Sequence, residues 1–281
     1  MMMNIYNQIV EYLQYPFVVY AIIVGTLTAL CASILGVSLV LKRFSYIGSS
    51  LSNVAFCSMV IGSVFNISFD MPIVLLVTII CAVLLLKNTE NAKIKGDATV
   101  TMISVGALAI GYLVINIFPT SSNVTADVCT TLFGSTSILT ISKEKVYFSC
   151  ILASIVIFIY VLFYNKIFAI TFDEEFASAV GTNVNKYNLL IATITAVIIV
   201  LAMQLVGSLL ITALIIFPPI SAMRVFKSFR GVVICSGIFS IICTITGILI
   251  SIISGTPVGA TIVVVDIIGF IIFTIIGRIR G

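Results

Sequence analysis

The chain has 281 residues, of which 61% are hydrophobic and only 9% charged, and its mean hydropathy is +1.30. Soluble proteins carry about 25% charged residues, so this composition excludes a soluble domain of any size. The formal net charge of +4 includes no basic cluster of the kind that binds nucleic acid. We therefore predict an all-α, polytopic membrane protein whose residues 1–281 form one transmembrane domain.

Apolar segments of membrane-spanning length recur along the whole chain, and a spanning helix needs about 20 mostly apolar residues. We predict about nine transmembrane helices (eight to ten), and in chain order they lie at 17–41, 49–66, 71–87, 98–117, 145–165, 187–206, 208–224, 231–254 and 259–278. The segment 118–142 leaves room for a short re-entrant helix.

The basic residues predict how these spans are oriented. Only two of the 14, Lys143 and Lys145, fall on one set of alternate connections. The other set holds Lys42, Arg43, Lys87, Lys93, Lys95, Lys166, Lys186, Arg224, Lys227, Arg230, Arg278 and Arg280. The positive-inside rule places this second set in the cytoplasm. The N-terminus is then outside and the C-terminus cytoplasmic.

Several kinds of chemistry are absent from the sequence. There is no histidine, which excludes a histidine general base and H-E-x-x-H zinc proteolysis, and no G-x-x-x-x-G-K-[ST] loop to hold ATP. Asp266 is the only acidic residue deep within a span, which argues against a two-aspartate protease. Six of the seven cysteines fit as small apolar residues of the spans, and Cys129 is the one candidate reactive thiol. We expect a transport subunit rather than an enzyme, with no cofactor of its own.

The longest cytoplasmic connection, 166–186, has the sequence KIFAITFDEEFASAVGTNVNK. Three acidic residues precede an apolar stretch, and acidic residues favour the first turn of a helix, for which Gly181 is a suitable end. We expect a short amphipathic helix lying across the cytoplasmic face. It could rest on lipid, but lipid-surface helices usually carry Lys and Arg. The acidic face favours docking to a protein partner.

Five blocks of the sequence carry a family resemblance. In chain order, LKRFSYIGSSLSNVAF (41–56) resembles a basic turn followed by G-D-x-L-S-H, and CTTLFGSTSIL (129–139) resembles an L-F-G element. FDEEFASAVGTN (172–183) is similar to F-D-x-E-x-A-x-x-x-G. The last two are LAMQLVGSLLITALIIFPPISAMRVF (201–226) and GTPVGATIVV (255–264), similar to V-G-x-L-L-x-x-A-L-x-x-x-P-x-x-x-A-R and P-x-G-A-x-I-V. Together they resemble the ABC-3 family, the membrane subunits of bacterial zinc and manganese ABC importers.

The resemblance implies a type II importer permease in the bacterial cytoplasmic (inner) membrane, with zinc or manganese as its cargo. It also implies three kinds of partner. These are an ABC ATPase that hydrolyses ATP, an extracytoplasmic metal-binding lipoprotein or periplasmic protein, and a second permease chain in a homodimer or close heterodimer. It assigns ATPase coupling to Phe172, Asp173, Glu175, Ala177 and Gly181. A stand-alone secondary transporter or channel for a small cation is the alternative, although Asp266 alone would serve ion coupling.

One departure from the family pattern concerns the expected translocation path. The Asp and His of G-D-x-L-S-H are replaced here by Ser49 and Asn53, which share one helix face and offer neutral oxygen donors. Zinc favours imidazole, thiolate and carboxylate. Three explanations of this departure are open. The path needs only weak contacts with the ion, or the cargo is a harder cation such as manganese, or a paired chain supplies the ligands. Asp266 is a further path candidate, since an intramembrane acid is often functional, and a structural hydrogen bond to Ser or Thr is the alternative. No residue is assigned as a metal ligand.

The remaining residues concern hinges and packing. Pro218 and Pro219 interrupt a span and must bend its helix, either as a packing kink or as a gating hinge. Gly207 and Pro257 mark outer turns, and Gly255 and Gly259 would permit close helix contact.

Overall fold

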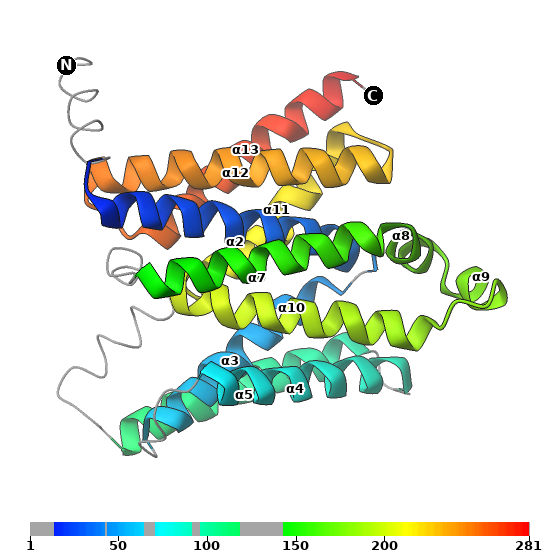
Figure 1. The fold of residues 1–281 in the computed structure, drawn as a ribbon, viewed down its shortest axis with the longest axis horizontal. Coiled ribbons are helices and arrows are strands. Elements are labelled where there is room, and N and C mark those ends of the chain that lie inside the picture. Colours follow the sequence, from blue (N-terminus) through cyan, green and yellow to red (C-terminus); the bar gives the residue numbers. More distant parts are fainter. Residues whose placement is uncertain (1–13, 43, 65–70, 92–95, 119–142, 281) are drawn as a thin grey trace.

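The structure is a computed structural model that describes residues 14–42, 44–64, 71–91, 96–118 and 143–280. In these ranges all regular secondary structure is helical, as the composition predicts (Figure 1). The helices are α2 (Pro16–Leu41), α3 (Ser45–Val64), α4 (Met71–Asn91), α5 (Gly96–Ile117), α7 (Lys143–Leu162), α8 (Tyr164–Phe172), α9 (Glu174–Ala179), α10 (Val184–Val206), α11 (Ser208–Val225), α12 (Phe229–Ser254) and α13 (Val258–Arg280).

A helix stands at each of the nine predicted spans, which confirms the all-α membrane architecture. Six helices in the described ranges are long and apolar enough to cross a membrane, and they belong to α2, α5, α10, α11, α12 and α13. The pair α7 and α8 would add a seventh span, bent by 67°. The possible re-entrant helix of 118–142, and Cys129 within it, lie outside the described residues except at Phe118.

Helix α3 is less apolar than these six because it carries several serines. Two of their hydroxyls are hydrogen-bonded to neighbouring helices. Ser50 Oγ donates to the Val100 carbonyl at 3.1 Å, and Ser52 Oγ donates to the Ser208 carbonyl at 3.4 Å. Polar residues within spans are stable when neighbouring helices bind them. Helix α3 therefore packs between α5 and α11 on a polar face.

The helices form two groups joined through a centre. In Figure 1, α3, α4 and α5 lie together on one side and α12 and α13 on the other, while α2, α10 and α11 occupy the middle. Buried residues make up 67% of the α10 span and 56% of the α2 and α11 spans, against 22% for α5 and 17% for α13. The chain therefore leaves most of α5 and α13 without protein cover.

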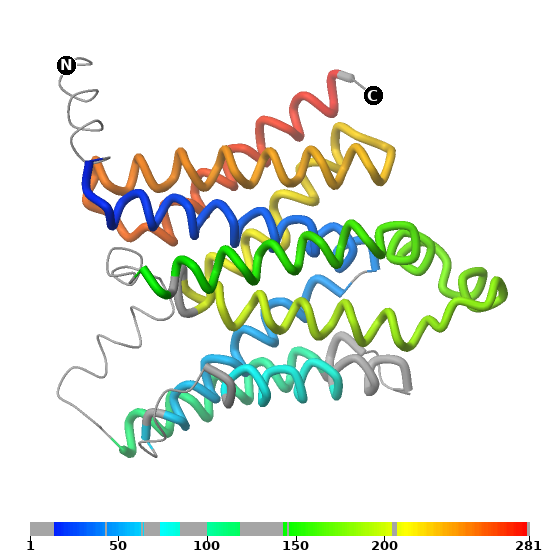
Figure 2. Tube along the Cα trace, viewed as in Figure 1, coloured from blue at the N-terminus to red at the C-terminus, as the bar shows by residue number. Residues whose placement is uncertain are grey.

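The two ends of the bundle differ. Figure 2 shows that α2 begins at one end, whereas α13 finishes at the opposite end, on the side of α8 and α9. The basic residues at the end of α2 and at the start of α10 and α12 lie on this second side. Lys143, the first residue of α7, lies at the first end. The basic residues named here therefore lie opposite Lys143 along the bundle, and which end is cytoplasmic stays a prediction.

Helices α2 and α11 touch through their backbones. Pro218 and Pro219 lie inside α11, so the carbonyls four residues before them have no N–H to accept from. One of these carbonyl oxygens, that of Ile215, lies so close to Gly36 that a Cβ there would sit 2.2 Å away. Only glycine allows this approach.

Candidate functional site

The segment between α7 and α10 projects from the bundle at its basic end (Figure 1). The Asp173 carboxylate caps α9 by accepting the Phe176 N–H at 2.8 Å, and two further acids fill the first turn. Gly181 follows the helix with a φ of +85°. The predicted acidic start and glycine end are confirmed as local structure.

The predicted single helix is wrong in one respect. Phe168, Ile170 and Phe172, expected to lead into the amphipathic helix, form a separate helix, α8, because the apolar stretch continues the helical pattern after the bend at Phe163. Ile170 is buried against the bundle, while Phe168 and Phe172 pack on Phe229 with ring centroids 5.2 and 5.9 Å away. Helix α8 thus packs on the bundle and leads directly into α9 at Asp173.

Helix α9 presents an exposed surface of mixed character. Phe172, Phe176 and Val180 are 60%, 63% and 65% exposed. Asp173 and Glu175 are exposed beside them, and Gly181 is exposed too. Ala177, in contrast, is buried and faces the body of the protein. Four of the five predicted coupling residues therefore form an open acidic and apolar surface, and the fifth anchors it.

A buried polar contact ties α9 to two spanning helices, and sequence reasoning missed it. Lys42 Nζ, at the end of α2, donates to Glu174 Oε1 at 2.7 Å and to Asn188 Oδ1 of α10 at 2.5 Å. Asn188 Nδ2 also donates to Glu174 Oε1 at 3.4 Å. The Lys42 side chain is only 6% exposed. The residues lie 132 and 146 positions apart, so no local pattern could have revealed them.

The predicted path residues Ser49 and Asn53 lie on α3, near the end that carries α9. Asn53 is half-buried, and its Nδ2 donates to Ser104 Oγ of α5 at 2.8 Å. Ser49 is half-buried. Within one chain, Asn53 therefore makes a contact between α3 and α5.

Asp266 lies on α13 and is fully buried. Neither of its carboxylate oxygens has a hydrogen-bond partner among the described residues. Ser240 Oγ and Thr244 Oγ1 of α12 complete the unpaired buried side-chain polar atoms of the described ranges. The predicted hydrogen bond from Asp266 to Ser or Thr is not formed. Asp266 faces α12 whereas Asn53 faces α5, so the predicted path residues do not form one cluster.

No group of three or more Cys, Asp or Glu side chains in the described ranges could hold a metal ion. Oxygen donors from Ser, Thr, Asn and the backbone are the polar atoms that these helices offer instead. Such neutral donors bind a divalent cation weakly.

The predicted hinge and packing residues take three different roles. Gly207 joins α10 to α11 with a φ of +93°, as expected of a turn. Gly255 ends α12 in the left-handed conformation with a φ of +64°, and nothing lies within 4 Å of a Cβ built on it. The expected close contact at Gly255 is therefore not formed. Pro257 precedes α13, and Gly259 is buried on that helix.

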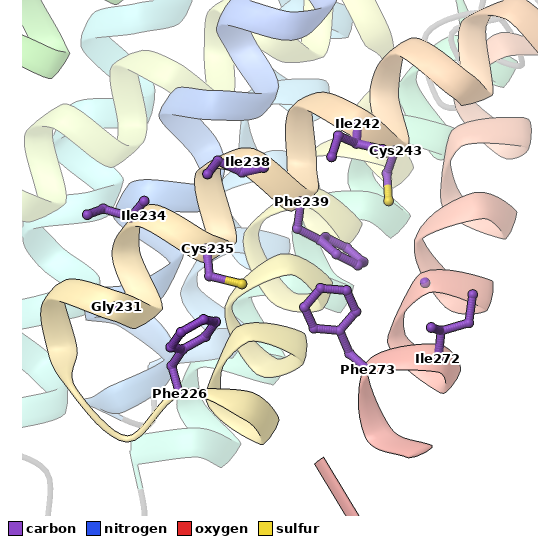
Figure 3. Close-up of a pocket in the computed structure, with 11 residues that line it drawn as sticks. Phe226, Gly231, Ile234, Cys235, Ile238, Phe239, Ile242, Cys243, Ile272 and Phe273 are labelled. Carbon is purple, nitrogen blue, oxygen red and sulfur yellow. The ribbon is translucent and has the colours of Figure 1, made fainter. Parts of the chain in front are cut away.

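A groove of about 520 Å³ separates α12 from α13 (Figure 3). Phe239 and Phe273 meet in it with ring centroids 5.0 Å apart, as Figure 3 shows. Its other lining residues are apolar or cysteine, and they include Cys235 and Cys243 on the same helix. Apart from the two thiols, this apolar groove offers no ligand to a passing cation.

Comparisons with known proteins match nearly the whole chain. A family model described as the ABC 3 transport family matches residues 14–277. The chain is 30% identical to the high-affinity zinc uptake system membrane protein ZnuB of Buchnera aphidicola, over 85% of this chain and 89% of the relative. It is 25% identical to the manganese transport system membrane protein MntC of Halalkalibacterium halodurans, over 91% and 85%.

The fold resembles a chain of PsaBC from Streptococcus pneumoniae in complex with Fab. The TM-score is 0.84 at 23% identity, and the match covers 97% of this chain and 95% of that one. At this identity the likeness supports the fold alone.

Proposed function

The chain belongs to the ABC-3 transport family, and from this premise we propose that it forms the translocation path of an ATP-driven importer of zinc or manganese. Its relatives include membrane proteins named for zinc uptake and for manganese transport. The chain is a multi-pass transport permease subunit, not an enzyme. Family membership supports this proposal over the alternative of a stand-alone secondary transporter.

The observation that carries the proposed coupling to ATP is the surface of α9. Exposed aromatic and acidic side chains stand together on a short helix that is capped by Asp173 and attached to the bundle through Lys42. A partner protein would bury Phe172 and Phe176, while Asp173 and Glu175 would pair with its basic residues. We propose that this partner is a separate ABC ATPase.

A second permease chain would complete the path. Helices α5 and α13 have the smallest buried shares among the six spans, and their outward faces are apolar, with residues such as Ile110, Leu113, Ile268 and Ile271 exposed. Obligate membrane dimers bury such faces by close packing. In the proposed homodimer, α5 and α13 of each chain face the partner chain.

The proposed path uses weak contacts. Ser49 and Asn53 offer neutral oxygens close to α5, one of the two helices that would face the second chain. An ion that must leave again needs weak binding at several sites. Oxygen donors suit manganese better than zinc, and this supports manganese as the cargo.

The proposed orientation places the α9 end in the cytoplasm and the Lys143 end outside, where the metal-binding lipoprotein or periplasmic protein would dock. Single cysteines at positions 143 and 227, in a chain without its native cysteines, should be labelled from opposite sides of the membrane. Labelling of both positions from the same side would overturn the orientation.

The coupling proposal is tested with Asp173→Lys plus Glu175→Lys. The matched control is Glu144→Lys, an exposed acid in the first turn of α7 at the opposite end. Each chain is co-purified with a candidate ATPase, and ATP hydrolysis and cellular zinc and manganese are measured. The double variant should insert normally, lose the ATPase and fail to accumulate metal, while the control retains all three. Normal ATPase stimulation by the double variant would refute docking at α9.

A further inference from the structure

A second groove, distinct from the one in Figure 3, lies between α7 and α12 with α2 as its floor. Its volume is about 480 Å³, within the ~300–1,000 Å³ range of pockets that hold small molecules. The lining residues come from three parts of the chain and are Ile34, Ile157, Tyr160, Val161, Tyr164, Asn165, Arg230, Val233 and Ile234. The groove opens on the outside of the bundle, where Val161 and Ile234 are 66% and 54% exposed.

This groove is polar at one end and apolar along the rest. Tyr164 and Asn165 begin α8, and Arg230 is the second residue of α12, so all three lie at the end of the bundle that carries α9. Ile157 and Ile34 lie deeper along α7 and α2. A ligand that fits must combine a polar head with a long apolar tail.

Arg230 is available to such a ligand. Its side chain is exposed, and the one ion pair within the described ranges joins Lys42 to Glu174. Arg230 therefore has no carboxylate partner among the described residues. A guanidinium presents five donors in a planar fork, which fits the oxygens of a phosphate in a bidentate manner. Tyr164 and Asn165, which line the groove with Arg230, add two more polar groups at this end.

The groove is shallower than one leaflet of a bilayer. From Tyr164 back to Ile157 the chain covers about 10 Å at ~1.5 Å per helical residue. Half of a hydrocarbon core measures about 15 Å. An acyl chain that starts at the level of Arg230 would thus lie along Val161, Ile157 and Val233 without reaching the bilayer centre.

We propose that this groove binds a membrane phospholipid with an anionic headgroup, whose phosphate contacts Arg230 and whose acyl chain lies between α7 and α12 over Ile34. Basic pockets between spanning helices on the cytoplasmic side are typical sites for anionic lipids. The α12–α13 groove of Figure 3 provides a contrast within the same protein, because its lining has no charged residue. It would accept acyl chains without preference for the headgroup.

The test compares phosphatidylglycerol with phosphatidylcholine of the same acyl chains. Each lipid is titrated into the purified full chain in detergent, and bound lipid is counted by native mass spectrometry. We expect phosphatidylglycerol to bind the wild-type protein more tightly. Arg230→Gln should reduce that affinity about tenfold or more, as expected for lost hydrogen bonds to a charged group. Arg230→Lys should show an intermediate loss, since it keeps the charge and loses the fork.

The matched control is Lys227→Gln, an exposed basic residue at the same end that does not line the groove. This variant should bind phosphatidylglycerol like the wild type. Val161→Trp, which fills the apolar part, should weaken both lipids. Equal binding of phosphatidylglycerol by Arg230→Gln and wild type would overturn the proposal. So would an altered dimer fraction in Arg230→Gln with unchanged lipid binding, because the groove would then be a protein contact.

Discussion

The contact among Lys42, Glu174 and Asn188 gives a quantitative prediction about how firmly α9 is held. Replacing Glu174 with Gln removes the anionic partner of an ammonium whose side chain is only 6% exposed. The charge then remains buried with the Asn188 amide oxygen as its partner. Replacing Lys42 with Met has a milder effect, because the Glu174 side chain is 47% exposed and water can hydrate its carboxylate.

The expected magnitudes lie between those of surface and buried ion pairs. Exposed pairs contribute about 0.2–1 kcal/mol, and removal of one partner from a buried pair costs about 3–5 kcal/mol. With one buried and one half-exposed partner, Glu174→Gln should weaken attachment of α9 by about 2 kcal/mol, a factor of roughly 30. Lys42→Met should cost about 1 kcal/mol, roughly fivefold. The double variant should resemble Lys42→Met alone, since the cation is absent from both.

Hydrogen exchange followed by mass spectrometry measures how firmly the α9 segment is attached. Amides of residues 173–186 exchange when the segment opens locally, and the rate follows the opening equilibrium. These peptides should exchange about 30-fold faster in Glu174→Gln and about fivefold faster in Lys42→Met, while peptides from α12 remain unchanged. The reasoning fails if Lys42→Met is the more damaging change, or if both variants exchange at the wild-type rate.

Three further outcomes are expected. Gly36→Ala should destabilise the protein by about 3 kcal/mol, because its Cβ would meet a backbone carbonyl of α11 at 2.2 Å; in Gly62→Ala, where nothing lies within 4 Å, the thermal midpoint should not fall. Asp266→Asn should raise that midpoint by removing a buried, unpaired carboxylate, and a lower midpoint would mean that the charge is paired. Ser49→Asp with Asn53→His should change zinc or manganese uptake, compared with Asn53→Ala; identical uptake would leave both residues with packing roles.

The positions of the spanning helices could be predicted because hydropathy is a local property of the sequence. Each predicted span falls on a helix, with ends that differ by a few residues. The acidic start of α9 could also be predicted, since a capping residue such as Asp173 binds a backbone N–H only three residues away. Helix α8 was missed because its aromatic residues suit a connection as well as a helix, and only their packing on Phe229 decides.

The contacts between distant segments could not be predicted in this way. From the sequence, Lys42 was used only to predict the orientation of the spans. In the structure it has two partners more than a hundred residues away. Asn53 was assigned to the path from its motif position, whereas its bond to Ser104 depends on how α3 and α5 pack. The groove at Arg230 likewise arises from three helices that meet in space.

The proline pair of α11 has a consequence for motion. Bending an ordinary helix breaks backbone hydrogen bonds, which is costly where no water can replace them. At Pro218 and Pro219 the helix lacks these bonds from the outset, so a change of angle there sacrifices little enthalpy. The neighbouring Gly36 has no side chain, so the backbone of α2 approaches the Ile215 carbonyl directly. We therefore expect one half of α11 to tilt at Pro218 and Pro219 more easily than half of an unbroken helix would, while the contact with α2 is kept.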